Sequence, residues 1–136
     1  MENEDKNDIV VKDKGGLEKF ITDEKQIGKL IKPLMREIHL FDSFVAGTTH
    51  LEDDSVLEDI SAGEKLDLKR EDNKFDDNAI LILKKDGRKI GYVPEKDNVV
   101  FARLMDAGKL LEARITDIEK RGSFTRIAIG IYMIDF

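Results

Sequence analysis

Cysteine is absent from this chain of 136 residues. The absence excludes disulfide bonds, thiolate metal ligands and a cysteine nucleophile. Five of the first six residues are polar and three of them are acidic, unlike the apolar stretch of a signal peptide. No segment approaches the roughly 18 uninterrupted apolar residues of a membrane span. We therefore expect a soluble, cytoplasmic protein without a membrane partner.

Histidine is scarce, and the common motifs of enzymes are missing. His39 and His50 do not form an HxxxH pair, and the chain has neither a GxGxxG loop nor a P-loop. The pairs Asp53–Asp54 and Asp76–Asp77 could bind Mg²⁺, but neighbouring carboxylates on a strand point to opposite faces. We expect no catalytic residue, metal site or cofactor, and keep a Mg²⁺-dependent nuclease or nuclease accessory as a lesser alternative.

Basic residues are outnumbered, with 23 Lys and Arg against 29 Asp and Glu and a formal charge of −6. The part of the chain after Glu37 holds 15 basic and 20 acidic residues. Broad capture of duplex DNA depends on neutralising many phosphates, so this balance argues against it. A small site that reads one end of a strand, through stacking and a few polar contacts, remains compatible with it.

Periodicity divides the chain into three parts. Residues 1–16 are charged and aperiodic, which indicates a flexible acidic tail. Residues 17–38 show helical spacing of apolar side chains and form a predicted N-terminal helical segment, which Pro33 kinks or divides. The third part, residues 39–136, has a strand-like period and forms the main predicted domain.

That domain is predicted to be mostly β, of the α+β class. Strands are expected at residues 40–47, 65–70, 79–83, 89–93, 110–118 and 126–134, with a helix at about 99–107. Asp86–Gly87 is a strong hairpin turn signal, and Gly108 ends the helix. Gly130, within the last strand, indicates a bulge or tight curvature. A small, mostly antiparallel barrel of about six strands with one or two helices accommodates this order best.

One polar run, residues 70–79, suggests a binding site. Asn73, Asp76 and Asn78 are good turn formers, and a simple turn explains most of the run. The turn does not explain Phe75, which must either plug the barrel mouth or stand exposed. An exposed ring beside a carboxylate and an amide suits stacking on a nucleobase and a hydrogen bond to a sugar hydroxyl.

Four motifs together resemble the HIRAN domain family. They are a V-x-G strand at residues 45–47, G-x-x-L-x-L-x-R at 63–70, N-x-F-D-x-N-A-I at 73–80, and G-x-x-I-G-Y-V-P at 87–94. The resemblance covers about residues 40–136. It implies a modified, OB-like β-barrel that binds nucleic acid, as in eukaryotic fork-remodelling translocases of the Swi/Snf class, where the domain captures the 3′ end of single-stranded DNA.

Carried over by position, the resemblance makes Phe75 a stacking platform and Asp76 the acceptor for the 3′ hydroxyl. Phe124 matches a second stacking ring. Thr49 and His50 stand where such members have Arg and Tyr, so Thr49 supplies no guanidinium and His50 stacks more weakly. A Lys of such members falls near Pro94–Glu95 here. Replacement cations are sought among six residues: Lys69, Arg70, Arg88, Lys120, Arg121 and Arg126.

The leading hypothesis is a non-enzymatic module that binds single-stranded DNA at its 3′ end, in a setting such as DNA repair. Its nucleic-acid-binding residues would be His50, Phe75, Asp76, Phe124, Thr49, Lys69 and Arg70, and a helicase or nuclease is a possible partner protein. The alternative is a protein-interaction adaptor that contacts its partner through residues 27–38 or the acidic residues 52–54.

Overall fold

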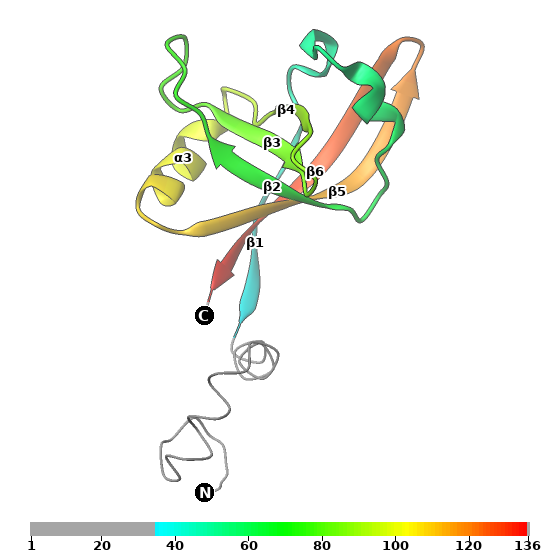
Figure 1. Ribbon diagram of the computed structural model, residues 1–136. Coiled ribbons are helices and arrows are strands. Elements are labelled where there is room, and N and C mark those ends of the chain that lie inside the picture. The colour runs from blue at the N-terminus through cyan, green and yellow to red at the C-terminus, as the bar shows by residue number, and fades with distance from the viewer. Residues whose placement is uncertain (1–34, 136) are drawn as a thin grey trace, which may run out of the picture. The chain divides into compact units, whose positions relative to one another are not determined.

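The computed structural model describes residues 35–135, of which Glu37–Asp135 form one compact unit (Figure 1). A single six-stranded sheet dominates this unit, in the order β1-β6-β5-β2-β3-β4. The strands are β1 (Arg36–Phe44), β2 (Lys65–Arg70), β3 (Ile80–Lys84), β4 (Lys89–Tyr92), β5 (Leu110–Arg121) and β6 (Phe124–Asp135). The pairs β2–β3, β2–β5, β3–β4 and β5–β6 are antiparallel. The predicted mostly-β fold with about six strands is confirmed.

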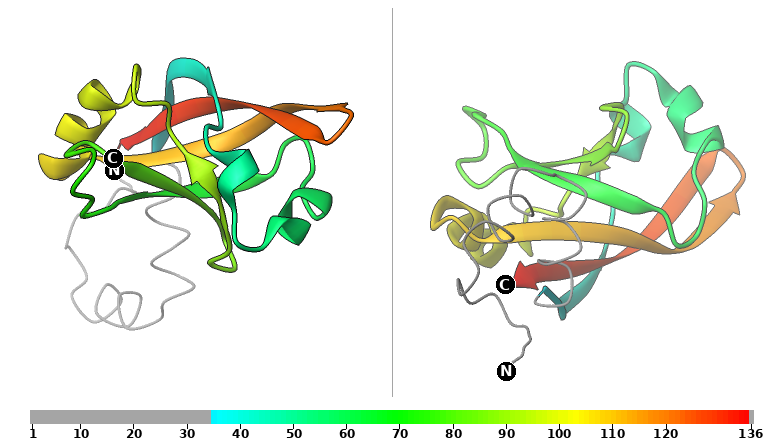
Figure 2. Two further views of the ribbon diagram at one scale, coloured as in Figure 1. Left: turned by 90° about the horizontal axis from the view of Figure 1, so that it is seen from above. Right: turned by 60° about the horizontal axis from the view of Figure 1, so that its bottom comes forward.

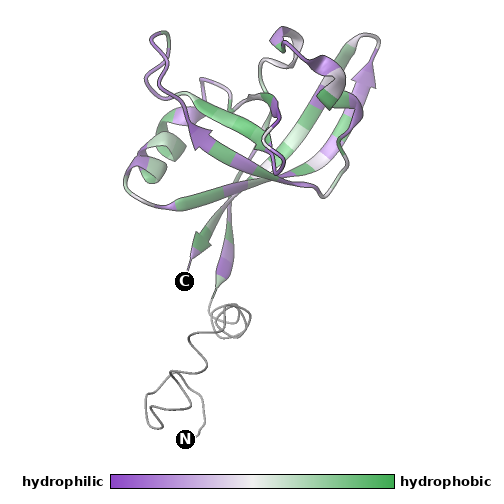
Figure 3. Ribbon diagram, in the orientation of Figure 1, coloured by the Kyte–Doolittle hydropathy of each residue, from purple (hydrophilic) through white to green (hydrophobic). Residues whose placement is uncertain are grey.

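Side chains that alternate along the strands build the core. On β3, Ile80 and Ile82 are fully buried, and on β6 the same holds for Ile127, Ile129 and Ile131. Successive side chains of a strand point to opposite faces, so one face of the sheet carries the apolar residues. In Figure 3, β3 is accordingly hydrophobic, while the turn that leads into it is largely hydrophilic. The sheet curls around this core in the views of Figure 2.

A short bridge after β1 closes the curl. The N–H of Ala46 donates to the Tyr92 carbonyl at 2.8 Å, and the N–H of Tyr92 donates to the Ala46 carbonyl at 2.9 Å. The neighbouring N–H of Val45 donates to the Ile127 carbonyl of β6 at 2.9 Å. Residues 45–46 thus join β4 to β6, which lie at different places in the strand order.

Gly91 allows this close approach. A Cβ atom at Gly91 would lie 2.3 Å from the Ala46 carbonyl oxygen and 2.5 Å from Val45 Cγ1. Its φ of 156° is also a value that residues with a side chain rarely adopt. The glycine of the I-G-Y-V-P motif is therefore a packing requirement of the closed sheet.

The β5–β6 hairpin is longer than predicted. The charged residues 119–121 were expected in a loop but belong to β5, and only Gly122 and Ser123 lie between the strands. The register shifts between Ile115 and Asp117, so the irregularity lies on β5. Gly130 pairs regularly with Arg114, and a Cβ there would lie 3.0 Å from the Tyr132 ring. Gly130 therefore makes room for that ring.

The first strand begins earlier than predicted. Residues 36–38 belong to β1, so a helix that extends to Ile38 is wrong at its end. Ile38 and Leu40 are half-buried while their neighbours are exposed, which is the alternation of a strand. Glu37 pairs with Arg114 of β5, a contact that the extended backbone allows. The remainder of the predicted helical segment and the acidic tail lie outside the described residues.

The remaining elements are one α-helix and two short 3₁₀ helices. The α-helix, α3 (Asn98–Asp106), begins after Asp97 and ends before Gly108, whose φ is 93°, as predicted. The 3₁₀ helices η2 (Thr48–His50) and η3 (Asp54–Glu58) lie in the segment between β1 and β2, which was expected to be a loop. No helix in residues 35–135 is long and apolar enough to span a membrane.

Replacing Gly91 with alanine should destabilise the fold by about 1–3 kcal/mol or more, because the new methyl group overlaps the Ala46 carbonyl. Urea unfolding followed by circular dichroism would measure the loss. Gly87→Ala is the matched control, since Gly87 also has a positive φ but open space around its Cβ position. Equal losses in both variants would show that the close approach is not the constraint.

Candidate nucleic-acid interface

The turn between β2 and β3 presents an aromatic ring to solvent. The N–H of Phe75 donates to Asn73 Oδ1 at 2.8 Å, and the N–H of Asn78 donates to Asp76 Oδ1 at 2.9 Å. These side chain–backbone bonds are the turn chemistry expected from Asn and Asp. They fix the backbone on both sides of Phe75, whose ring remains 84% exposed. The turn thus holds an apolar ring away from the core.

A buried side-chain amide forms a hydrogen bond with the carboxylate of Asp76. Asn98, the first residue of α3, is 1% exposed, and its Nδ2 donates to Asp76 Oδ2 at 2.8 Å. Each carboxylate oxygen of Asp76 therefore accepts one hydrogen bond. A carboxylate offers about four acceptor positions. Asp76 is half-buried, so it can accept a further hydroxyl group without giving up either bond.

Arg70 braces the same turn from the end of β2. Its guanidinium donates to the carbonyl groups of Asp77 and Ala79 at 2.8 and 2.7 Å, and to Asp106 at 2.9 Å. Asp106 lies at the end of α3, so Arg70 ties the turn to the helix. Its donors are directed into the protein, and its predicted contact with DNA stays a prediction.

A chain of polar contacts leads from the turn to β4. Asn73 Nδ2 donates to Glu71 Oε1 at 3.1 Å, and the Tyr92 hydroxyl donates to the same oxygen at 2.7 Å. Lys89 Nζ lies 3.1 Å from the Tyr92 hydroxyl and 4.4 Å from the centre of its ring. We call the surface formed by Glu71, Asn73, Phe75, Lys89 and Tyr92 the β4 surface.

His50 and Thr49 lie on η2, which follows the bridge at Ala46. His50 and Lys89 line one cavity of about 210 Å³ together with Leu51, Glu52, Asp53, Val56 and Arg88. Both His50 and Thr49 are exposed. The cavity places His50 beside Lys89, at the edge of the β4 surface, and its role in stacking stays a prediction. The side chain of Thr49 makes no hydrogen bond within the described residues, and its predicted contact with DNA stays a prediction too.

Phe124 does not lie at the β2–β3 turn. It begins β6 at the tip of the β5–β6 hairpin, which is distant from the β2–β3 turn in each view of Figures 1 and 2. By strand alternation its side chain shares a face with Arg126 and is opposite to the buried Thr125. The guanidinium carbon of Arg126 lies 4.0 Å from the centre of the Phe44 ring. Phe124 is 42% exposed, and its role as a stacking ring stays a prediction.

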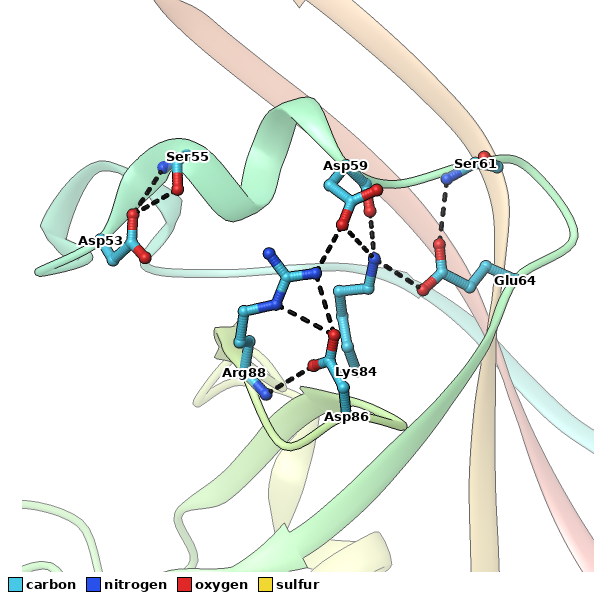
Figure 4. A network of polar contacts seen from close by, with 8 residues as sticks. All are labelled: Asp53, Ser55, Asp59, Ser61, Glu64, Lys84, Asp86 and Arg88. Carbon is cyan, nitrogen blue, oxygen red and sulfur yellow. Dashed lines mark hydrogen bonds and ion pairs between the residues drawn. The ribbon is translucent and has the colours of Figure 1, made fainter.

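Most of the proposed replacement cations are neutralised by neighbours. Arg88 contacts Asp59 at 2.5 Å and Asp86 at 2.9 Å, in the network of Figure 4, and these bonds raise its pKa. The same network encloses Lys84, which contacts Asp59 and Glu64. Lys120 pairs with Glu58 and Arg121 with Glu119. Lys69 is exposed and has no partner within residues 35–135.

Sequence reasoning missed three residues of the site. They are Asn98, Tyr92 and Lys89, none of which was among the predicted binding residues. On a regular strand, residues three apart point to opposite faces, so nothing in the sequence pairs Lys89 with Tyr92. The β3–β4 register shifts between Ile82 and Leu83, which gives β4 an extra residue and lets Lys89 and Tyr92 meet.

Comparison with known proteins identifies the family. The model of the HIRAN domain matches residues 38–133. The chain belongs to the HIRAN domain family. A crystal structure of a protein from Lactobacillus plantarum superposes with a TM-score of 0.69 and 26% identity, over 75% of this chain and 99% of that chain. The HIRAN domain of human HLTF superposes with a TM-score of 0.52 and 18% identity, over 74% of each chain.

A search of curated proteins gave no match. Within residues 35–135 no group of three or more His, Asp or Glu side chains is arranged to hold a metal ion. In particular, Asp76 directs its oxygens at Asn78 and Asn98.

The bond between Arg70 and Asp106 should make the β2–β3 turn sensitive to acid. Hydrogen bonds from Arg70 hold the pKa of Asp106 below its ordinary value of 3.8. The resulting stability is fully present above that ordinary value and is lost as pH falls through the lowered one. The stability difference between wild type and Asp106→Asn, measured by urea unfolding, should therefore shrink as pH falls below about 4.

Asp117→Asn serves as the control, because Asp117 is an exposed carboxylate without an ion-pair partner in the described part of the chain. A difference for Asp106→Asn that stayed constant from neutral to acid pH would contradict the assigned role of the ion pair.

Proposed function

We propose that this HIRAN domain binds single-stranded DNA at its 3′ end and catalyses no reaction. HIRAN domains are nucleic-acid-binding modules, and the family assignment carries that general function to this chain. The observation that supports the specific form is the exposed ring of Phe75 beside a braced Asp76. The solvent-facing ring offers a terminal base a stacking platform, which every base can use.

In this mechanism Asp76 recognises the terminal hydroxyl. The N–H of Asn78 and the amide of Asn98 orient its two oxygens, and the remaining acceptor positions receive the 3′ hydroxyl proton. A hydrogen bond to a charged group contributes about 1.5–3 kcal/mol. A phosphate at the same position would place an anion against the carboxylate. The site thus favours a free 3′ end by attraction and rejects a phosphorylated one by repulsion.

The acidic charge of the chain fits a short contact. Stacking contributes about 1–3 kcal/mol per base, so two bases give a useful affinity without a long basic groove. Besides Phe75, the proposed stacking groups are His50 and Phe124, of which only His50 borders the β4 surface. A helicase or nuclease that acts on such ends, in a process such as DNA repair, is the partner class that this function implies.

The alternative from another class remains a protein-interaction adaptor. Its proposed contacts are residues 27–38, of which 27–34 lie outside the described residues, and the acidic Glu52, Asp53 and Asp54. Asp53 accepts hydrogen bonds from Ser55 and caps η3, so part of this acidic group serves the fold. Partner binding by an adaptor would not depend on Phe75, so a variant of Phe75 distinguishes the two proposed functions.

Replacing Phe75 with alanine should weaken the binding of a 5′-labelled oligothymidine by about 1–3 kcal/mol, since one stacking platform is removed. Fluorescence anisotropy titration measures the change. Val100→Ala is the matched control, because Val100 is also an exposed apolar residue (63%) but lies on α3. Unchanged affinity in Phe75→Ala would refute the stacking role and favour the adaptor.

Wild-type protein should bind an oligonucleotide with a free 3′ hydroxyl more tightly than the same strand with a 3′ phosphate. The reason is the repulsion between that phosphate and Asp76. A strand phosphorylated at its 5′ end instead provides the charge-matched control, and all three strands are compared as unlabelled competitors of one 5′-labelled strand. If the free and 3′-blocked strands bound equally, recognition of the 3′ end would be wrong, whatever the affinity.

A further inference from the structure

An acidic domain that binds a polyanion needs cations that its own carboxylates do not neutralise. Around the β2–β3 turn and the β3–β4 hairpin, ion pairs occupy Arg70, Lys84, Lys85 and Arg88. Lys85, for example, contacts Asp67 at 2.5 Å and Glu112 at 3.1 Å. These charges hold the sheet together and attract an external anion only weakly.

Lys89 is different. Among residues 35–135 no carboxylate lies within ion-pair distance of its ammonium group, and the side chain is exposed. Within the described residues, the ammonium group makes its hydrogen bond and its cation–π contact with Tyr92. The ammonium group is thus held beside Tyr92 without a carboxylate partner, with donors left for another acceptor.

Lys89 is also joined to the proposed end-binding site. The Tyr92 hydroxyl donates to Glu71, which also accepts a hydrogen bond from Asn73. Asn73 in turn accepts from the N–H of Phe75. On its other side lies the cavity of about 210 Å³ that it shares with His50. A strand that ends at Asp76 and crosses Tyr92 therefore arrives next at Lys89.

We propose that Lys89 binds a backbone phosphate of a single strand whose 3′ end is held at Phe75–Asp76. The proposal rests on the proposed function and adds a phosphate position to it. Tyr92 lies beneath the strand between the two positions, and His50 borders the cavity on the far side of the phosphate. An acidic domain needs only one cation without a carboxylate partner at this position, because that cation contacts only a strand that lies across Tyr92.

A purely structural role for Lys89 predicts a different result. The cation–π contact between its ammonium group and Tyr92 lies at an exposed site, so its contribution to stability is small. Removing it would then change stability slightly and leave the salt dependence of DNA binding unaltered. Salt dependence is therefore the decisive measurement, because it counts the phosphates that the protein binds.

The test is a titration of 5′-fluorescein oligothymidine with a free 3′ hydroxyl at several salt concentrations. For single strands, each phosphate that the protein neutralises adds about 0.7 to the steepness of log K against log salt. Lys89→Gln should lower the slope by about this amount, and Lys89→Arg should restore it. Lys109→Gln is the charge-matched control, because Lys109 is exposed and unpaired in the described chain but lies between α3 and β5.

The outcomes separate the two proposals. If Lys89→Gln lowers the slope, Lys89 binds a phosphate, and the preference of the wild type for a free 3′ end decides separately whether that strand ends at Asp76. If the slope is unchanged, or if Lys109→Gln lowers it equally, the phosphate position is wrong. The preference of the wild type for a free 3′ end then remains to support the end-binding site by itself.

Discussion

The absence of a side chain at Gly91 is the constraint on which the arrangement of the domain depends. It lets the backbone at Ala46 reach Tyr92 and form two hydrogen bonds, which close the curled sheet. The same crossing brings η2 beside β4, because η2 follows Ala46 directly in the chain. The cavity between His50 and Lys89 exists as a result. A packing requirement in the core thereby determines which polar groups share a surface.

Ion pairs within the domain determine how much positive charge its surface presents. Most Lys and Arg side chains near the turn and the hairpin are used for internal ion pairs, for example Arg88 with Asp59. Exposed pairs of this kind contribute little stability, but together they remove positive charge from the surface. Recognition of nucleic acid then depends on a few fixed groups. This explains how a chain with a net charge of −6 can belong to a nucleic-acid-binding family.

The sequence predicted those features whose cause is local. Alternation predicted the strand at Lys65–Arg70, and glycine signals predicted the Asp86–Gly87 turn and the end of α3. Phe75 is exposed, as one of the two alternatives for an aromatic residue in a polar turn required. Two kinds of feature could not be predicted from the sequence. The charged residues 119–121 resemble a loop and become strand only through pairing with β6. Asn98 and Asp76 meet 22 residues apart, a contact that only the tertiary fold creates.

The strand order also has a kinetic consequence. The hairpins β2–β3, β3–β4 and β5–β6 join neighbours in the chain, whereas β1 pairs with β6 and its extension reaches β4. Contacts between distant residues require the chain to close a long loop before any energy is gained. The hairpins can therefore form early, while β1 and the bridge at Ala46 join last. Until then the domain exposes an open sheet edge at β6, which is the state most prone to association with other chains.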